Sequence, residues 1–184
     1  MSFPCRPTPL RGCFELEAVF SSDERGSFTK IHRADWLEEI AGERLVFRET
    51  YYSTSNPGTL RGLHLQRPPA HYWKLLHCLD GEIFDVILDL RAGSGTFGKA
   101  YTLTLGAEGH RSVLIPPGCA HGFCVPGPRA ARVLYEVTAT HSPEHDTGVL
   151  WSSAPVAWPV TAPVMSARDR ALPTLESYGT GIAL

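Results

Sequence analysis

Apolar and polar residues alternate along much of the chain in short runs. In the run 101–105, a tyrosine and two leucines alternate with threonines, which is the period of a half-buried β-strand. The runs 83–90 and 131–139 have the same period and are rich in β-branched and aromatic residues. Each run therefore predicts a strand with one apolar face. The predicted faces hold Phe84, Val86, Leu88 and Leu90 in the first strand, and Ala131, Val133, Tyr135, Val137 and Ala139 in the second.

Turn-forming residues separate the apolar runs. The chain has 17 glycines and 15 prolines spread over its length, as in Asn56-Pro57-Gly58 and Pro116-Pro117-Gly118. The second of these turns separates two further predicted strands, 112–115 and 121–125. With about eight to ten strands and little helix, the pattern predicts an all-β protein with a jelly-roll barrel.

One short helix is expected near the N-terminus, at Ala34–Ala41. Its apolar residues, among them Leu37 and Ile40, recur at helical spacing. Gly42 follows as a natural C-terminal stop, because glycine readily takes the left-handed conformation that ends many helices.

Composition narrows the class of protein. A length of 184 residues favours a single domain, 1–184, and a net charge of −2 without blocks of like charge excludes an electrostatic nucleic-acid surface or a basic membrane helix. No apolar run is long enough to span a membrane, and the first twelve residues lack the core of a secretory signal. The five cysteines contain no CxxC pair, so we expect reduced thiols and a cytoplasmic location, with Cys78 in the core.

Polar residues interrupt several predicted strands. Gly62, His64 and Gln66 share one face of the run LRGLHLQ, Tyr135 lies among valines, and His121 precedes an apolar run. Because the interior of a small barrel holds either apolar side chains or a ligand, this convergence predicts a ligand cavity. Strict alternation places Arg61 on the face opposite His64, unless Gly62 allows a bend or bulge that redirects one of them.

The chain supplies only part of the residue pattern that binds a metal in many cupins. The segment PPGCAH fits the second half of the general cupin signature, PxGxxH, which often supplies one metal ligand. The first half normally supplies two histidines as HxH, but here it reads His64-Leu65-Gln66, and glutamine is a poor ligand for the metals that imidazole favours. We therefore expect neither a metal nor another cofactor.

The remaining candidates suit acid–base chemistry. A histidine oriented by a carboxylate can abstract a proton near neutral pH. Tyr135 can be the opposing acid, and Lys74 can stabilise an oxyanion. This set suits removal of a proton next to a carbonyl group and its return from the other side, so the product would be an epimer.

The same residues carry a resemblance that spans almost the whole chain. The sequence resembles the dTDP-4-dehydrorhamnose 3,5-epimerase family of nucleotide-sugar enzymes. The matching segments, in order, are DERGSF at 23–28, RGLHLQ at 61–66, Lys74, GEIFDVILDLR at 81–91, SGTFG at 94–98, IPPGCAHGF at 115–123, Tyr135, Trp151, Trp158-Pro159 and SARD at 166–169.

The resemblance implies a cupin jelly roll and a homodimer in which an N-terminal segment reaches the partner's site. It also implies a nucleoside-diphosphate sugar as substrate, His64 as base with Asp169 beside it, and Tyr135 as acid. Lys74 and Arg61 would stabilise the enolate oxygen. The residues at positions that bind or frame the substrate are Arg25, His121 and Arg168.

Several substrate-facing positions depart from the family pattern. Lys30 and Asp146 stand where the family has glutamate, and Tyr72-Trp73 replaces Gln-Gly or Gln-Ala. A Gln-Asp-Asn run becomes Glu49-Thr50-Tyr51, and the tyrosine that stacks on thymine falls on His141. We hypothesise weaker selection of thymidine, with a GDP- or CDP-linked 4-keto sugar as the alternative substrate. A cupin sugar 3,4-ketoisomerase and a non-catalytic or metal-binding cupin are the alternative functions.

Overall fold

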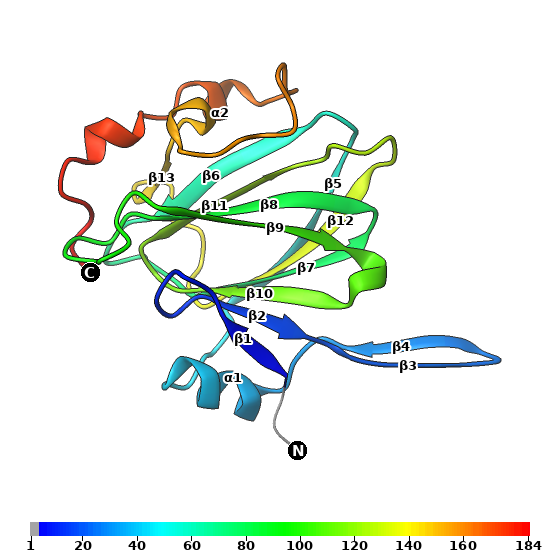
Figure 1. Ribbon diagram of the computed structural model, residues 1–184. Coiled ribbons are helices and arrows are strands. Elements are labelled where there is room, and N and C mark those ends of the chain that lie inside the picture. Colours follow the sequence, from blue (N-terminus) through cyan, green and yellow to red (C-terminus); the bar gives the residue numbers. More distant parts are fainter. Residues whose placement is uncertain (1–3) are drawn as a thin grey trace.

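The computed structural model describes residues 4–184, in which antiparallel strands form two facing sheets (Figure 1). The first sheet has six strands in the order β1-β2-β10-β7-β12-β5, and the second has five in the order β13-β6-β11-β8-β9. This architecture confirms the predicted all-β jelly roll. The strands of the six-stranded sheet are β1 (Cys5–Pro7), β2 (Phe14–Glu17), β10 (Arg111–Ile115), β7 (Lys74–Asp80), β12 (Ala131–Val137) and β5 (Glu49–Ser55).

The remaining elements complete the described chain. The strands of the five-stranded sheet are β13 (Asp146–Gly148), β6 (Leu60–Gln66), β11 (Cys119–Cys124), β8 (Glu82–Asp89) and β9 (Ala100–Gly106). A separate hairpin is formed by β3 (Val19–Asp23) and β4 (Gly26–Lys30). The helices are α1 (Ala34–Ala41), α2 (Ala167–Arg170) and the 3-10 turns η1 (Ala107–Gly109), η2 (Trp151–Ser153) and η3 (Leu175–Tyr178).

The main core lies between the two sheets. Strand β12 directs Ala131, Val133 and Tyr135 into it, as the period of two predicts, and β9 contributes Leu103 and Leu105. Cys78 is also buried in this core, as predicted, and no cysteine of residues 4–184 forms a disulfide. Strand β12 ends at Val137, so the predicted fifth member of its face, Ala139, lies beyond the strand.

Helix α1 covers the outer face of the six-stranded sheet. Its bounds are those predicted, and Gly42 ends it in the left-handed conformation with φ 74°. Leu37 is the fully buried residue of the helix, and it packs with Leu75 of β7 and Leu114 of β10. The apolar spacing that predicted the helix is therefore also what holds it against the sheet.

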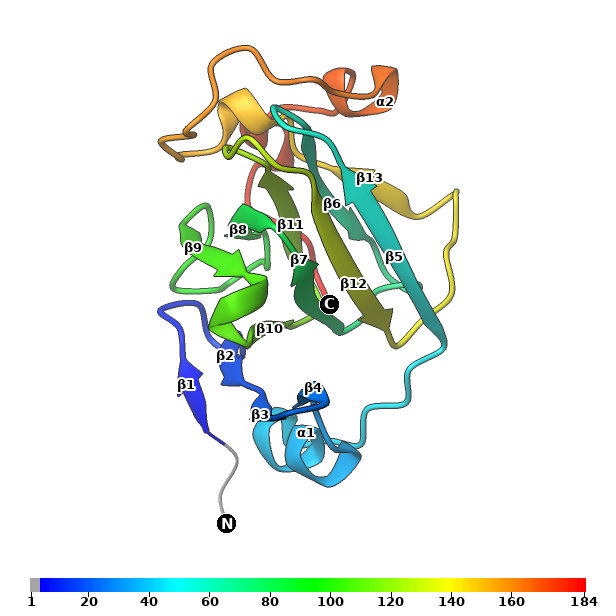
Figure 2. The ribbon, with the colours of Figure 1, turned by 90° about the vertical axis from the view of Figure 1, so that its right-hand side faces the viewer.

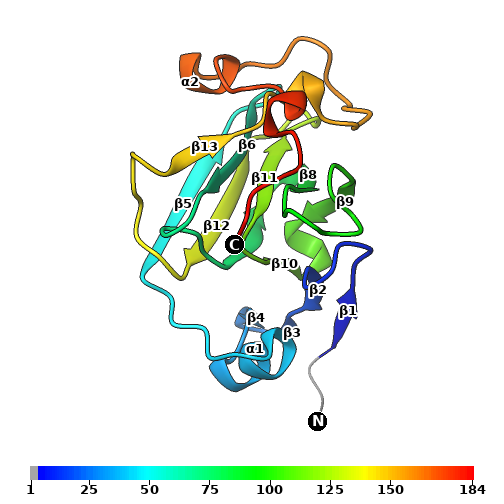
Figure 3. The same ribbon diagram turned by 90° about the vertical axis from the view of Figure 1, so that its left-hand side faces the viewer.

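The C-terminal segment covers the outer face of the five-stranded sheet, on the side of the barrel opposite α1 (Figure 2). Val86 and Leu88 of β8 pack there against Trp158 and Tyr178, and the last residues run beside β8 and β11 (Figure 3). Both faces of β8 are buried as a result, and the inner face carries Asp85 and Asp89.

Residues 4–184 contain more strands than the eight to ten predicted, because the short strands β1, β3, β4 and β13 lack a clear apolar alternation. The hairpin of β3 and β4 extends away from the barrel (Figure 1), and all five residues of β3 are exposed. The two described α-helices are both too short and too polar to cross a membrane.

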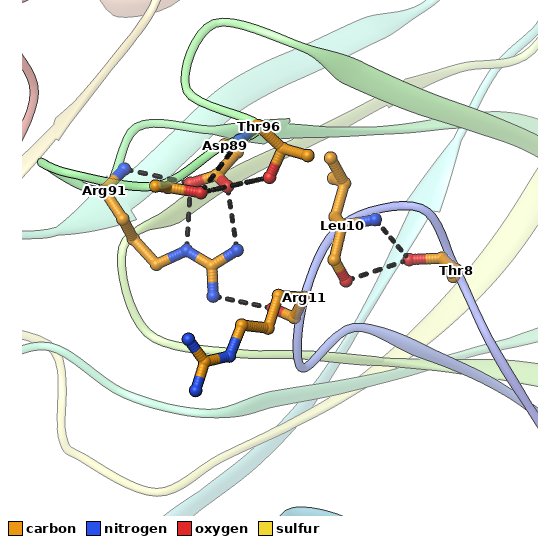
Figure 4. A network of polar contacts seen from close by, with 7 residues as sticks. Thr8, Leu10, Arg11, Asp89, Arg91 and Thr96 are labelled. Carbon is orange, nitrogen blue, oxygen red and sulfur yellow. Dashed lines mark hydrogen bonds and ion pairs between the residues drawn. The ribbon is translucent and has the colours of Figure 1, made fainter.

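A polar network closes the loop that follows β8 (Figure 4). Asp89 is fully buried, and both of its carboxylate oxygens accept hydrogen bonds from Arg91 at 2.8–2.9 Å. The hydroxyl groups of Ser94 and Thr96 each donate a further bond of 2.6 Å. Arg91 also donates to the backbone oxygen of Arg11, which ties the loop to the N-terminal segment. Every acceptor in this network has a partner, so its role is structural.

Candidate active site

A cavity of about 340 Å³ opens between the two sheets. It is lined from both sheets and from the C-terminal segment. All the substrate and catalytic residues predicted from the sequence line it except Asp169, Arg25 and Lys30. The lining residues are Glu49, Tyr51, Ser53, Arg61, His64, Tyr72, Lys74, His121, Gly122, Phe123, Tyr135, His141, Asp146 and Arg168.

His64 and Asp169 form a pair at one wall of the cavity. The His64 Nε2 atom lies 2.7 Å from Oδ1 of Asp169, and the other oxygen of Asp169 accepts a bond of 3.2 Å from the backbone nitrogen of Gly62. Asp169 is buried behind the histidine, whose side chain is 26% exposed. The other ring nitrogen of His64, Nδ1, has no hydrogen bond within the described part of the chain, so it can accept a proton from a ligand.

The short helix α2 orients Asp169. Ser166 is its N-cap, and the serine hydroxyl accepts a 3.0 Å bond from the backbone nitrogen of Asp169. Burial alone would raise the pKa of the Asp169 carboxyl, but hydrogen bonds from His64 and Gly62 outweigh it and lower that pKa below its ordinary value. The carboxylate therefore stays ionised and holds the imidazole in one orientation.

A bulge in β6 brings Arg61 to the same cavity as His64. The pairing of β6 with β11 shifts register between His121 and Phe123, and Gly62 has φ 109°. A Cβ atom at Gly62 would lie 2.6 Å from the Cα atom of Gly122, so only glycine fits where the two strands approach. Of the two alternatives for Arg61, the structure has the bulge.

Tyr135 lies on the other sheet, at the wall that faces His64. It is 7% exposed, and its hydroxyl lies 3.1 Å from the hydroxyl of Ser53. The ring of Tyr51 stacks on it with centroids 4.9 Å apart. Burial raises the pKa of the Tyr135 phenol well above its ordinary value, although the Ser53 bond opposes this. Tyr135 is therefore protonated at neutral pH and available as an acid.

Lys74 begins β7 and is 5% exposed within the cavity. Burial lowers the pKa of its ammonium to about 8, while the negative charges of Asp85 and Asp146 oppose that shift. Within residues 4–184, the ammonium has no hydrogen bond or ion pair with another side chain. Its N–H donors are thus free for an oxygen atom of a ligand.

A second histidine–aspartate pair lies beside the first. His121 of β11 is paired with His64 of β6 in the sheet, and its Nε2 atom lies 2.7 Å from Oδ1 of Asp85. Burial lowers the pKa of the His121 imidazole, although the negative charge of Asp85 opposes this. The sequence analysis included His121 but not Asp85, because the residues that predicted β8 lie on its opposite, apolar face.

Four further predicted residues pair with one another in the cavity lining. The Glu49 Oε1 atom accepts a 3.0 Å bond from the backbone nitrogen of His141, and Arg168 forms a 2.6 Å ion pair with Asp146. Gln66 is not a lining residue; it bonds to the backbone of the 140–142 loop and so positions His141.

Arg25 and Lys30 lie away from this cavity, on the hairpin of β3 and β4. The Arg25 side chain is 85% exposed and forms a 2.5 Å ion pair with Asp23. Within one chain, the structure therefore does not bring the two residues to the other predicted site residues.

The sequence analysis missed Asp85 and Ser53 as functional candidates, and it named Tyr72 only as a departure from the family pattern. Asp85 and Ser53 each bond to a predicted residue, and Tyr72 places its ring 5.5 Å from the Lys74 ammonium. Ser53 could have been found from the period of two in β5, which places it on the same face as Glu49 and Tyr51. Among residues 4–184, no group of three or more His, Cys, Asp or Glu side chains could hold a metal ion.

The barrel defines a cupin, and a histidine and a tyrosine, two side chains capable of acid–base chemistry, line its cavity from opposite walls. A family model described as dTDP-4-dehydrorhamnose 3,5-epimerase matches residues 7–177. A relative of that name from Shigella flexneri is 42% identical over 156 residues, which cover 84% of this chain and 86% of the relative. The chain belongs to the dTDP-4-dehydrorhamnose 3,5-epimerase family.

Solved structures of this fold agree with that assignment. NovW, a 4-keto-6-deoxy sugar epimerase from the novobiocin biosynthetic gene cluster of Streptomyces spheroides, superposes with a TM-score of 0.91 at 30% identity, covering 96% of this chain and 89% of NovW. The dTDP-4-dehydrorhamnose 3,5-epimerase of Bacillus anthracis, solved with TDP and PPi bound, superposes at 0.88 with 38% identity, covering 94% and 99% of the two chains.

Proposed function

We propose that this protein is an isomerase that inverts C3, C5 or both in a dTDP-linked 4-keto-6-deoxy sugar. The proposal is supported by membership of the family and by one observation above others. His64, with Asp169 behind it, and Tyr135 lie on opposite sheets of one cavity. A carbon atom held between them has a base on one face and an acid on the other, which is what inversion requires.

The chemistry begins at a carbon next to the C4 ketone. His64 abstracts the proton there, and the Asp169 carboxylate stabilises the imidazolium that forms. The electron pair moves to the ketone oxygen, and the Lys74 ammonium donates a hydrogen bond to the resulting enolate. Tyr135 then delivers a proton to the opposite face of the same carbon, so the configuration is inverted and the ketone is restored.

The reaction is tested by incubating the protein with the dTDP-4-keto-6-deoxy sugar and assigning the product by proton NMR. Inverted ring-proton couplings with the ketone still at C4 support the proposal. A ketone at C3 with no inversion would identify a 3,4-ketoisomerase, and unchanged substrate that remains bound would identify a binding protein.

A cytoplasmic location stays a prediction. The proposed active form of the protein is a homodimer. The hairpin of β3 and β4 extends from the barrel and exposes Phe20 (43%) and Phe28 (58%) beside Arg25. Two exposed aromatic residues on a projecting hairpin favour packing on another surface. Docked on a second copy, the hairpin would carry Arg25 and Lys30 to the partner's cavity.

Mixed dimers test this arrangement. Arg25→Ala and His64→Ala are each expected to be inactive alone, because each lacks a residue that every site needs. Mixing equal amounts should restore activity to about a quarter of wild type. About half of the dimers are then mixed, and in each mixed dimer one of the two sites has both residues intact. No recovery on mixing, with dimers present by sedimentation, would mean that Arg25 does not act across the interface.

A GDP- or CDP-linked sugar is the second candidate substrate, favoured by Glu49 in the cavity lining. A carboxylate only accepts hydrogen bonds, so it suits a base that presents amino donors better than it suits thymine. Competition among the thymidine, cytidine, guanosine and uridine diphosphates for the purified protein decides between them. A preference for the thymidine diphosphate of about tenfold or more, the cost of one lost buried polar contact, would exclude the alternative.

A further inference from the structure

Lys74 is a buried cation without a counter-ion in contact. It carries no ion pair and no hydrogen bond from its ammonium within the described residues, and it is 5% exposed. A charge in such a position normally loses its proton, because the low dielectric disfavours the charged form. An enzyme that uses this ammonium to stabilise an enolate needs it protonated and needs its donors unoccupied.

Among residues 4–184, this ammonium has one cation–π contact, with an aromatic ring, and no hydrogen bond or ion pair. The Lys74 Nζ atom lies 5.5 Å from the centroid of Tyr72. The face of a phenol ring carries partial negative charge and attracts a cation at this distance, more strongly where water is excluded. A ring face attracts the charge without accepting a strong hydrogen bond, so the N–H donors stay available for a ligand.

The chain positions this ring through the alternation that leads into β7. Trp73 points outward, where its indole nitrogen donates a 2.8 Å bond to Glu43 and its ring packs with the α1 cluster. Tyr72 and Lys74, one residue to either side, both line the cavity instead. The ring is therefore fixed next to the ammonium by a residue anchored on the opposite face of the sheet.

We propose that Tyr72 is a positioning residue that keeps Lys74 protonated and aimed at the substrate oxygen through a cation–π contact. The inference rests on the proposed role of Lys74 at the enolate.

Other ionisable groups near Lys74 also affect the pKa of its ammonium. Asp85 and Asp146 favour the protonated ammonium, whereas Arg168 opposes it. His121 is uncharged at neutral pH because burial lowers its pKa, and burial raises the pKa of Tyr72 itself, so its phenol is neutral as well. The ring thus acts through its face and not through a phenolate charge. The ionisable groups that face Lys74 are Tyr72, Asp85, His121, Tyr135, Asp146 and Arg168.

The test replaces the ring while keeping the site apolar. In Tyr72→Leu the ring face is lost, and in Tyr72→Phe it is kept without the hydroxyl. The chain has three lysines, of which Lys30 and Lys99 are exposed, so the Nζ resonance of Lys74 can be assigned in [15N]lysine-labelled protein by comparison with Lys74→Arg. Its titration is then followed by NMR without substrate.

We expect Lys74 to titrate alike in wild type and in Tyr72→Phe, and about one pH unit lower in Tyr72→Leu, the shift that corresponds to a desolvated cation–π contact. The alkaline limb of kcat should move down by the same amount, with a smaller change in KM. If Tyr72→Leu does not fold, Tyr72→Met serves in its place.

Two results would overturn the proposal. An unchanged Lys74 titration in the variant without a ring would show that the ring does not hold the charge. A shift in Tyr72→Phe equal to that in Tyr72→Leu would assign the effect to the hydroxyl. Because the titration needs no turnover, a shifted Lys74 in a protein that epimerises no sugar would refute the proposed function and leave the contact standing.

Discussion

Two aspartates on strand β8 have different roles: one stabilises a loop, and the other lies next to the proposed active site. Asp85 and Asp89 lie on the inner face of β8, and both side chains are fully buried. Asp89 accepts bonds from Arg91, Ser94 and Thr96, which together occupy both of its oxygens (Figure 4). Asp85 has one bond, to His121, and its Oδ2 atom has no partner within the described residues.

The difference follows from what surrounds each carboxylate. Burial raises the pKa of the Asp89 carboxyl, but the bonds from Arg91, Ser94 and Thr96 outweigh it and lower that pKa to about 2. Asp85 instead lies beneath the cavity, where its charge favours the protonated form of Lys74. A satisfied carboxylate stabilises a loop, whereas a partly satisfied one next to a cavity adjusts the charge of the groups that meet the substrate.

This comparison predicts that changes at the cavity reduce activity, whereas changes at the Asp89 loop reduce stability. The largest effect is expected for His64→Ala. Removing a positioned base costs about two to four decades of rate. The measurement is exchange of substrate protons in deuterated water, together with thermal unfolding to show that the fold is retained.

His77→Ala is the matched control for this variant. His77 is also a buried strand histidine, but it bonds to Ser112 on the outer face, away from the cavity. It should lose stability and keep the exchange rate. Wild-type exchange in His64→Ala would assign the base to another residue.

In Tyr135→Phe, we expect the second-largest effect, a different change in the rate of proton exchange and in the rate of net inversion. Exchange needs only the base, whereas inversion needs a proton from the opposite face. We therefore expect exchange to persist while net inversion falls by about a hundredfold or more. Both rates are read from one NMR time course. Inversion at the normal rate would mean that water or another side chain supplies the proton.

Asp89→Asn should produce the largest loss of stability and the smallest loss of activity. Breaking the ion pair between the buried Asp89 carboxylate and the half-buried Arg91 costs about 3 kcal/mol. The comparison is urea unfolding of wild type, Asp89→Asn and Asp80→Asn, in which an exposed carboxylate serves as control. An Asp89→Asn protein as stable as the control would contradict the structural role of the network.

The same variant makes a pH prediction whose direction is fixed by the lowered pKa. An unfolded aspartate has a pKa of about 3.9, so the ionised Asp89 stabilises the fold fully above about pH 4. That contribution, about 2 to 3 kcal/mol, is lost as the pH falls through about 2. The difference in unfolding free energy between wild type and Asp89→Asn should therefore decrease as the pH falls from about 4 to about 2. It should stay constant from pH 5 to 8.

The sequence predicts those helices and strands whose apolar residues recur at regular spacing within a few residues of one another. Helix α1 was predicted with its bounds because its apolar spacing and Gly42 act within a few residues. Strands with strong alternation, such as β9 and β12, were predicted for the same reason. The hairpin of β3 and β4 was not, because its residues are exposed on both faces and leave no periodic signal.

The site residues also fall into two groups, those predicted from a local pattern and those that depend on contacts distant in sequence. His64 and Tyr135 stand out as polar residues in apolar strands, so the sequence alone marks them. The partner of His64 is distant in sequence, and it was named only through the resemblance of SARD to a family motif. Asp85 was missed because the prediction of its strand rested on the opposite, apolar face, and its hydrogen bond to His121 joins two strands that are distant in sequence. Arg61 depended on a bulge, which alternation cannot predict.

The most direct test of the account follows the label from water into the product. Wild-type protein and the dTDP-4-keto-6-deoxy sugar are combined in deuterated water, and deuterium is located by NMR and mass spectrometry. The account predicts deuterium at C3, C5 or both, with inverted configuration wherever it is found, the ketone still at C4, and no label in the presence of His64→Ala. Inversion without deuterium, or deuterium with the ketone moved to C3, would contradict it.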